Sequence, residues 1–200
     1  MAMLTLVWLG IVAIAIGALM LVLWYQQQQN IPIAPPTANQ IPLKRGFFTL
    51  QLGDIVQYEG IDWVVEERLS YEEEGDVWFD YLLQDQDTIR WLSVEEGDRV
   101  EICWMETITD LEVSHHPPAQ LTYQGLTYRR RESGVALMTK LDSRASHHSV
   151  TCHYTDYTAS NQHILSVERW NGDVEITVGK QIPASALVLL PGDGHRVYND

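Results

Sequence analysis

The sequence predicts an all-β protein, in which a duplicated β-meander forms one roughly ten-stranded barrel or sandwich, together with one N-terminal transmembrane helix. Three observations lead to this prediction. Residues 2–25 contain no charged side chain. From Phe47 onward, short apolar runs alternate with turn-forming residues. Finally, a stretch that begins near residue 77 recurs near residue 150. The elements are taken below in chain order.

Residues 2–25 are long and apolar enough to cross a bilayer, because about 20 apolar residues suffice for a spanning helix. A cleaved signal peptide is the alternative. It usually has a basic leading region and a shorter apolar core, and neither is present here. No Lys or Arg precedes the span, whereas Lys44 and Arg45 follow it. The positive-inside rule therefore favours a single-pass protein of the cell membrane, with its folded domain on the cytoplasmic side.

Residues 26–45 follow as a linker that contains four prolines and a run of four glutamines. Proline fixes φ and removes a backbone donor, so this segment is expected to be an extended spacer rather than a folded element.

The first part of the folded domain reads as five strands separated by turn signals such as Glu59-Gly60 and Glu96-Gly97-Asp98. Alternation supports the assignment, because Val100, Ile102 and Trp104 would share one face of a strand while Glu101 lies on the other. The expected strands are Asp54–Tyr58, Asp62–Leu69, Val77–Leu83, Ile89–Val94 and Arg99–Met105.

An internal repeat follows a proline-containing break at residues 111–119. The motif LSVE occurs at residues 92–95 and again at 165–168, and VEI occurs at 100–102 and again at 174–176. We therefore expect β repeat 1 at 46–112 and β repeat 2 at 119–190, with a tail at 191–200. Each half is too small to bury its own face well, so the two are expected to form one domain.

Charge divides the two halves. Residues 46–112 carry 19 acidic and 3 basic side chains, a net of −16, whereas residues 119–190 carry 6 acidic and 7 basic ones, a net of +1. An acidic chain disfavours nucleic acid as a partner, because proteins that bind it present basic patches to phosphates. The acidic half is either a solubilising surface or an acidic face for a protein partner.

Several short motifs of the first half are similar to a known family. Tyr58-x-Gly60, Trp63-Val64-Val65, Trp78-x-x-Tyr81-Leu82-Leu83 and residues 91–95 (WLSVE) resemble the bacterial family catalogued as domain of unknown function 4178. The resemblance covers about residues 50–190 when both repeats are counted, as two diverged copies. In the second copy, Thr151 and Ile164 stand where the first copy has its tryptophans. The resemblance implies no activity; some relatives occur beside membrane or envelope-stress proteins.

The candidate ligand-binding residues are aromatic side chains of the first repeat. Trp78 and Tyr81 differ in strand parity, so only one of them can point inward, and the other is expected to line a groove or pocket. Core packing is the competing interpretation. The candidates are Trp63, Trp78, Tyr81 and Trp91.

The sequence contains only weak signals for a catalytic site or a metal site. Glu95 and Glu168 recur in both repeats and would serve a hydrolase as an acid–base pair, or simply form the polar face of a strand. Histidines 147, 148 and 153 are where a metal would be sought, although their spacing matches no ligand pattern, and we expect neither a metal nor a cofactor. Cys103 and Cys152 could pair in a single disulfide, which the sequence leaves open.

These observations favour a membrane-anchored, non-enzymatic binding or scaffolding module, linked to membrane or envelope maintenance. Its partners would be the membrane and a protein that contacts the acidic face of repeat 1. The alternative is a β-barrel that binds a small apolar ligand among its tryptophans, and a hydrolase using Glu95 or Glu168 ranks third.

Overall fold

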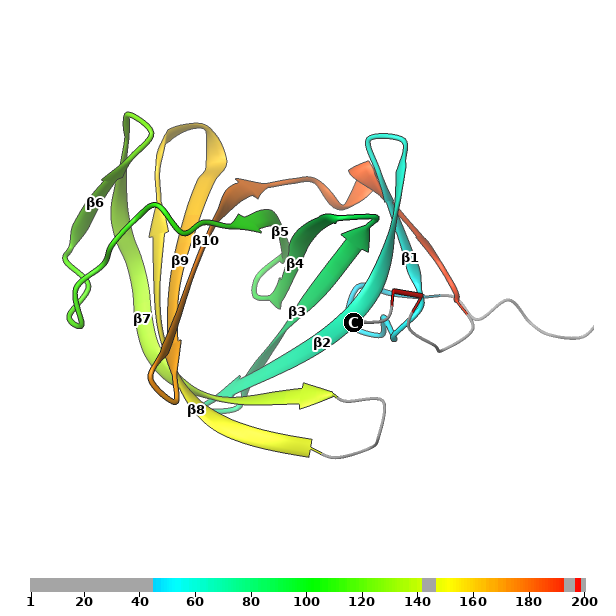
Figure 1. Cartoon of the computed structure of the whole chain (residues 1–200), viewed down its shortest axis with the longest axis horizontal. Coiled ribbons are helices and arrows are strands. Elements are labelled where there is room, and N and C mark those ends of the chain that lie inside the picture. The colour runs from blue at the N-terminus through cyan, green and yellow to red at the C-terminus, as the bar shows by residue number, and fades with distance from the viewer. Residues whose placement is uncertain (1–44, 142–146, 193–196, 199–200) are drawn as a thin grey trace, which may run out of the picture. The chain divides into compact units, whose positions relative to one another are not determined.

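A computed structural model describes residues 45–141, 147–192 and 197–198, which belong to one compact unit. The structure contains a single antiparallel sheet (Figure 1). Two single-turn 3₁₀ segments, Ser160–Gln162 and Ala184–Ala186, lie between the later strands. The strands are β1 (Ile55–Tyr58), β2 (Ile61–Glu73), β3 (Asp76–Asp85), β4 (Thr88–Glu96), β5 (Val100–Thr107), β6 (Gln120–Tyr123), β7 (Leu126–Leu141), β8 (His147–Thr158), β9 (His163–Trp170), β10 (Asp173–Gln181) and β11 (Leu187–Leu190).

The five strands expected in the first repeat are confirmed, and four of them, β2 to β5, are longer than predicted. β2 and β3 continue to a tight turn at Glu74 and Gly75, whose φ values of 52° and 101° are positive. The tight turn between β9 and β10, at Asn171 and Gly172, has φ values of 51° and 92°. Both residues of such a turn must adopt positive φ, which explains the choice of Asn and Gly.

The sheet closes into a ring of eight strands. Neighbouring strands pair in the order β2-β3-β4-β5-β10-β9-β8-β7, and β7 then pairs with β2 through the register Arg68↔Leu141 to Glu72↔Leu137. β1 and β11 continue the sheet beyond β2, and β6 continues it beyond β7. Figure 1 shows β7 and β8 running beneath β2 where this closure occurs. Closure pairs backbone N–H and C=O groups that would otherwise be exposed at the edges of the sheet.

Alternation along each ring strand sorts side chains into two sets. In β4, Leu92 and Val94 are buried in an apolar cluster, whereas Trp91, Ser93 and Glu95 line a central cavity. Consecutive residues of a strand point to opposite faces of the sheet. Two apolar clusters therefore lie on the face away from the cavity, while a third, which includes Leu69, Trp91 and Met105, lies on the cavity side. One cluster is built around Leu50, Tyr81 and Ile102; its counterpart in the second half contains Tyr157, Leu165 and Val167.

The two halves follow the same plan. Strands β1–β5 and β6–β10 are each joined in sequence, and the first turn of each half has two residues with positive φ, Glu59-Gly60 and Gln124-Gly125. β2 has a register shift at Glu66, and β7 has one at Arg131. Each of these residues comes three positions after the aromatic residues Trp63 and Tyr128, which the sequence repeat aligns. The two bulges therefore occupy equivalent positions, and the residues at them, Glu66 and Arg131, carry opposite charges.

The predicted fold class is corrected in three respects. The described residues form eleven strands rather than roughly ten, because residues 187–190 add β11 to β1. The strands form one closed sheet instead of a two-sheet sandwich, because β7 is long enough to pair with both β8 and β2. The structure also departs from the predicted fold class in its helix: the described residues contain no α-helix and none that could span a membrane. The segment 2–25 assigned to it lies outside them.

The two halves meet at β5 and β10, where the backbones come unusually close. A Cβ atom added to Gly179 would overlap the carbonyl oxygen and carbon of Trp104 and the Cα atom of Met105. Gly179 pairs with Met105 in the register, so this glycine permits the seam between the halves. Glycine within a strand often marks such a close approach.

We predict that Gly179→Ala destabilises the protein by at least about 2 kcal/mol, because overpacking against backbone atoms cannot be relieved by a rotamer change. The measurement is urea unfolding of the full-length protein. Gly97→Ala is the control, since its nearest contact would be 3.8 Å away. Equal unfolding midpoints for the two variants would contradict the role of Gly179.

Candidate functional site: the central cavity

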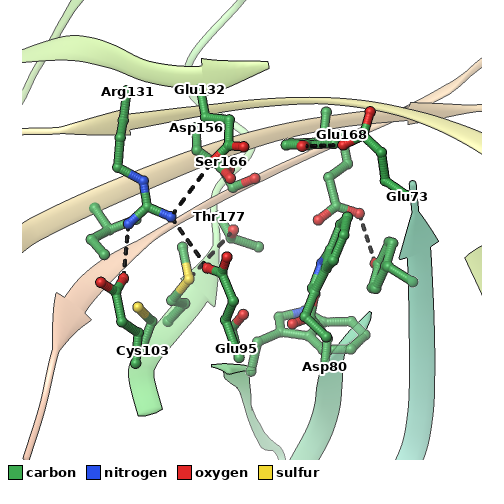
Figure 2. Close-up of a pocket in the computed structure, with 18 of the residues that line it drawn as sticks. Glu73, Asp80, Glu95, Cys103, Arg131, Glu132, Asp156, Ser166, Glu168 and Thr177 are labelled. Carbon is green, nitrogen blue, oxygen red and sulfur yellow. Dashed lines mark hydrogen bonds and ion pairs between the residues drawn. The ribbon is translucent and has the colours of Figure 1, made fainter. Parts of the chain in front are cut away.

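The eight ring strands enclose a cavity of about 470 Å³, which we call the central cavity. Every strand of the ring contributes side chains to its wall, so the closed sheet positions the site directly. Figure 2 shows polar side chains from both halves converging on this space.

The wall of the central cavity is strongly acidic. Among the described residues, eleven acidic side chains line it against a single basic one, Arg131. A cavity lined by one sign of charge concentrates the electrostatic field and attracts counter-ions. The acidic residues are Glu73, Glu74, Asp76, Asp80, Glu95, Glu96, Glu101, Glu132, Asp156, Glu168 and Glu175.

One part of the wall is aromatic. The rings of Tyr71 and Trp78 stack in parallel, with centroids 5.3 Å apart, and Tyr154 packs edge-on against Trp78 at 5.4 Å. The Tyr154 hydroxyl donates a hydrogen bond of 2.5 Å to Glu73, and that carboxylate also accepts a hydrogen bond from the backbone N–H of Val135. These contacts hold the aromatic wall against the end of β2.

Arg131 forms an ion cluster with two glutamates from the other half. Its Nη1 lies 2.8 Å from Glu101 Oε2, and its Nη2 lies 3.3 Å from Glu95 Oε2. Glu95 and Glu101 face each other across β4 and β5, so the guanidinium offsets a cross-strand pair of like charges. Partial burial raises the pKa of Glu95, and the positive charge of Arg131 opposes that rise. We call these three residues the Arg131 cluster.

Asp80, Glu168 and Glu175 form a second group, which we call the Asp80 cluster. Burial raises the pKa of Asp80 to about 7, and the negative charges of Asp156 and Glu175 contribute to the rise. Burial also raises the pKa of Glu168 well above its usual range, helped by the charge of Asp80. In Figure 2 Arg131 lies to the left, and Asp80 and Glu168 lie to the right.

The hydrogen bonds of the Asp80 cluster come from neutral donors. Glu168 Oε2 accepts a bond of 2.8 Å from the Tyr71 hydroxyl. Glu175 Oε1 accepts bonds from Trp91 Nε1 at 3.1 Å and from the Thr107 hydroxyl at 2.8 Å. The buried Oδ1 atom of Asp80 has no hydrogen-bond partner in the described part of the chain. An unpaired buried polar atom of this kind is costly in a folded protein.

The predicted aromatic candidates separate into two places. Trp78 and Trp91 line the central cavity, whereas Trp63 and Tyr81 are buried in the apolar cluster on the other face of the sheet. Trp78 and Tyr81 therefore point to opposite faces of the sheet, as predicted from their strand parity. Trp63 packs edge-on against Trp104 at 5.3 Å and does not contribute to the cavity wall.

The two recurring glutamates, Glu95 and Glu168, line the same cavity. Sequence reasoning missed Asp80 and the pair Glu101 and Glu175. The recurring VEI motif carried a signal for that last pair, because it places an acid at the same point of β5 and β10. Arg131 belongs to the basic run Arg129-Arg130-Arg131, which alternation would place opposite acidic residues of the first half, and its exact direction depends on the bulge in β7.

Histidine and cysteine add no further site. His153 is exposed on β8, and the side chains of His147 and His148 lie outside the described residues. Among the residues that the structure describes, no three metal-ligating side chains are grouped so that they could hold a metal ion. Cys103 and Cys152 are both buried and unpaired, and burial raises the pKa of each thiol, Cys103 to about 12.

Comparison with known proteins places the chain in context. The family model described as "Domain of unknown function (DUF4178)" matches residues 51–184, in a single match that spans both halves. Proteins from Mycobacterium tuberculosis (strain ATCC 25618 / H37Rv) and Mycobacterium bovis (strain ATCC BAA-935 / AF2122/97) are each 32% identical over 193 residues. That alignment covers 90% of this chain and 93% of each relative, and both are described as uncharacterized proteins. No solved structure matches the chain.

Asp80 makes stability depend on pH. Its pKa is raised from 3.8 to about 7, so the folded protein holds a proton that the unfolded chain releases. Its contribution to stability is therefore complete below about pH 4 and is lost as the pH rises through about 7. The free energy of unfolding of the wild type should fall between pH 5 and pH 8. We predict that this fall is smaller by about 2 kcal/mol in Asp80→Asn.

The measurement is urea unfolding of both proteins at the two pH values. Asp98→Asn, at the exposed turn between β4 and β5, is the matched control and should keep the wild-type dependence. If Asp80→Asn also kept that dependence, Asp80 would not be the buried acid described above.

Proposed function

The chain belongs to the DUF4178 family, whose description names no activity, and we therefore propose a function from the geometry of the cavity: a non-enzymatic binding module that holds a small, positively charged organic molecule in the central cavity. The observation that carries this proposal is the combination, in one enclosed space, of an aromatic wall and eleven carboxylates facing a single arginine.

The size and composition of the central cavity support a small-molecule ligand. Its volume of about 470 Å³ falls within the range of about 300–1,000 Å³ that is usual for ligand pockets. Such pockets combine aromatic side chains with a few polar groups that orient the ligand. Here Trp78 and Trp91 provide the aromatic surface, and the Asp80 cluster provides the polar groups.

The charge of the wall supports a cation over the apolar ligand considered from the sequence. An apolar molecule would displace water from the carboxylates without offering them a partner, which is unfavourable. A cation would offset their charge and could also lie over the face of Trp78, because aromatic faces attract cations. An anion would meet repulsion from nearly every side of the cavity.

A hydrolase is the second candidate. One observation favours it: Glu95 and Glu168 line the same cavity, and burial raises the pKa of both, as a general acid requires. Against it, Glu95 is held in an ion pair with Arg131, and Glu168 accepts a hydrogen bond from Tyr71. Detection of a converted product after incubation with a bound ligand would favour the hydrolase.

Two further expectations remain proposals. The first is descent from a duplication, which the equivalent strand order and the bulges at Glu66 and Arg131 support, although the family model spans both halves as one unit. The second is a protein partner on the acidic face of residues 46–112. Part of that acidic excess, including Asp80 and Glu101, lines the central cavity instead, so a partner would contact only the remainder.

The proposed function predicts a fluorescence response. The full-length protein is titrated with ethylguanidinium, ethylammonium, the neutral analogue propionamide and the anion propionate. We expect a saturable change in tryptophan emission with the two cations alone, because Trp78 and Trp91 line the cavity.

Trp78→Phe should remove most of that change, whereas Trp63→Phe should keep it, since Trp63 lies on the other face of the sheet. A response to propionate as large as the response to the cations would count against the proposal. So would the absence of a saturable response to either cation.

A further inference from the structure

The central cavity contains two equivalent pairs of glutamates. Glu95 of β4 is directly opposite Glu101 of β5, and Glu168 of β9 is directly opposite Glu175 of β10. All four side chains line the cavity, and they occupy the same positions of the recurring LSVE and VEI motifs. Like charges directly opposite each other on a sheet are destabilising, so each pair requires a counter-charge or a proton.

The first pair has its counter-charge within the protein. Arg131, at the bulge of β7, places its guanidinium within 2.8 Å of Glu101 and 3.3 Å of Glu95. A planar guanidinium is well suited to this task, because its several N–H donors can contact two carboxylates at once.

The second pair has no such arginine. The position in β2 that is equivalent to Arg131 is Glu66, which also lies at a bulge. Glu66 does not line the central cavity; its carboxylate is buried and accepts hydrogen bonds from the backbone N–H groups of Val197 and Tyr198, at 3.0 and 3.2 Å. Within the described ranges, Glu168 and Glu175 form no ion pair.

Asp80 adds a third carboxylate to this uncompensated pair. Its Oδ1 atom is buried and has no hydrogen-bond partner within residues 45–141, 147–192 and 197–198. The Asp80 cluster therefore contains the same cross-strand glutamate pair as the Arg131 cluster, without the cation. Removing a counter-charge from buried carboxylates is strongly unfavourable, and a bound cation would offset that cost.

We propose that the Asp80 cluster is the binding site for the guanidinium head of a small organic cation, which would occupy the place that Arg131 occupies in the equivalent pair. This inference rests on the proposed function and names its ligand class. The head would contact Glu168 and Glu175 as Arg131 contacts Glu95 and Glu101, and Asp80 would accept a further hydrogen bond. The aromatic wall at Trp78 would cover one face of the ligand.

An organic cation fits this site better than a metal ion does. No three ligating side chains converge suitably for a metal among the described residues, and the cluster includes the indole of Trp91 as a neighbour. A guanidinium is expected to bind more tightly than a primary ammonium, because it can contact two carboxylates bidentately while an ammonium acts as a point charge.

The test is isothermal titration of the full-length protein with ethylguanidinium, the head group of an arginine side chain. We expect saturable binding of one molecule, weakened at least tenfold by Glu168→Gln and by Glu175→Gln. Glu112→Gln, at an exposed position between β5 and β6, should bind within twofold of the wild type. Both glutamine variants relieve like-charge repulsion, so we expect them to fold, and thermal unfolding checks this.

A second variant tests the equivalence of the two clusters. Arg131→Ala removes the internal guanidinium, so the Glu95 and Glu101 pair becomes vacant and the stoichiometry of ethylguanidinium should rise from one to two. A stoichiometry that stays at one would overturn the inference.

The outcomes separate this inference from the proposed function. If ethylguanidinium binds the wild type and the Glu168→Gln and Glu175→Gln variants equally well, the cavity still binds cations and the assigned site is overturned. If neither ethylguanidinium nor ethylammonium binds, both the assigned site and the proposed function are overturned. Displacement of ethylguanidinium by stoichiometric Ca²⁺ or Mg²⁺ would overturn the ligand class.

Discussion

Closure of the sheet by the pairing of β7 with β2 is the constraint on which the rest of the structure depends. β7 is sixteen residues long, so it can pair with β8 along its length and with β2 near its end. Once the ring is closed, each strand has one face that turns toward the enclosed space. The alternating polar residues of the ring strands are then confined to a cavity, where they would be solvated on an open sheet.

Confinement makes the carboxylates of the cavity interdependent. Water in a closed space cannot screen them as bulk water does, so the protein must offset their charge by other means. It uses two. Arg131 neutralises the first glutamate pair directly, and a raised pKa allows Asp80 and Glu168 to remain protonated near neutral pH. The second solution leaves a site in which a cation can replace a proton, and the proposed ligand site follows from this difference.

Much of the fold could be predicted from the sequence because it depends on local patterns. Alternation and turn residues predicted the first five strands, and the LSVE and VEI motifs predicted which positions of the two halves correspond. Strand parity also predicted that Trp78 and Tyr81 point in opposite directions. Each of these inferences needs only the two-residue period of a strand, which the sequence displays directly.

Features that depend on closure could not be predicted in this way. Parity assigns residues to two faces, but it does not say which face will be enclosed, so Trp63 was grouped with Trp78 although they lie on opposite sides of the sheet. The pairing of β2 with β7 joins segments about 70 residues apart without a shared motif. The bulge at Arg131 directs that side chain into the cavity, and a bulge has no clear signature in a single sequence.

The proposed site depends on the Asp80 cluster holding half-buried carboxylates without a counter-charge. The most direct measurement is a ¹³C NMR titration of the side-chain carboxyl groups of Asp80 and Glu168 in the full-length protein, with and without ethylguanidinium. We predict that Asp80 titrates at about pH 7 in the free protein, that Glu168 titrates well above its ordinary range, and that both shift to lower pH when the cation binds. Titration of both groups in the ordinary acidic range, unchanged by the cation, would contradict this account.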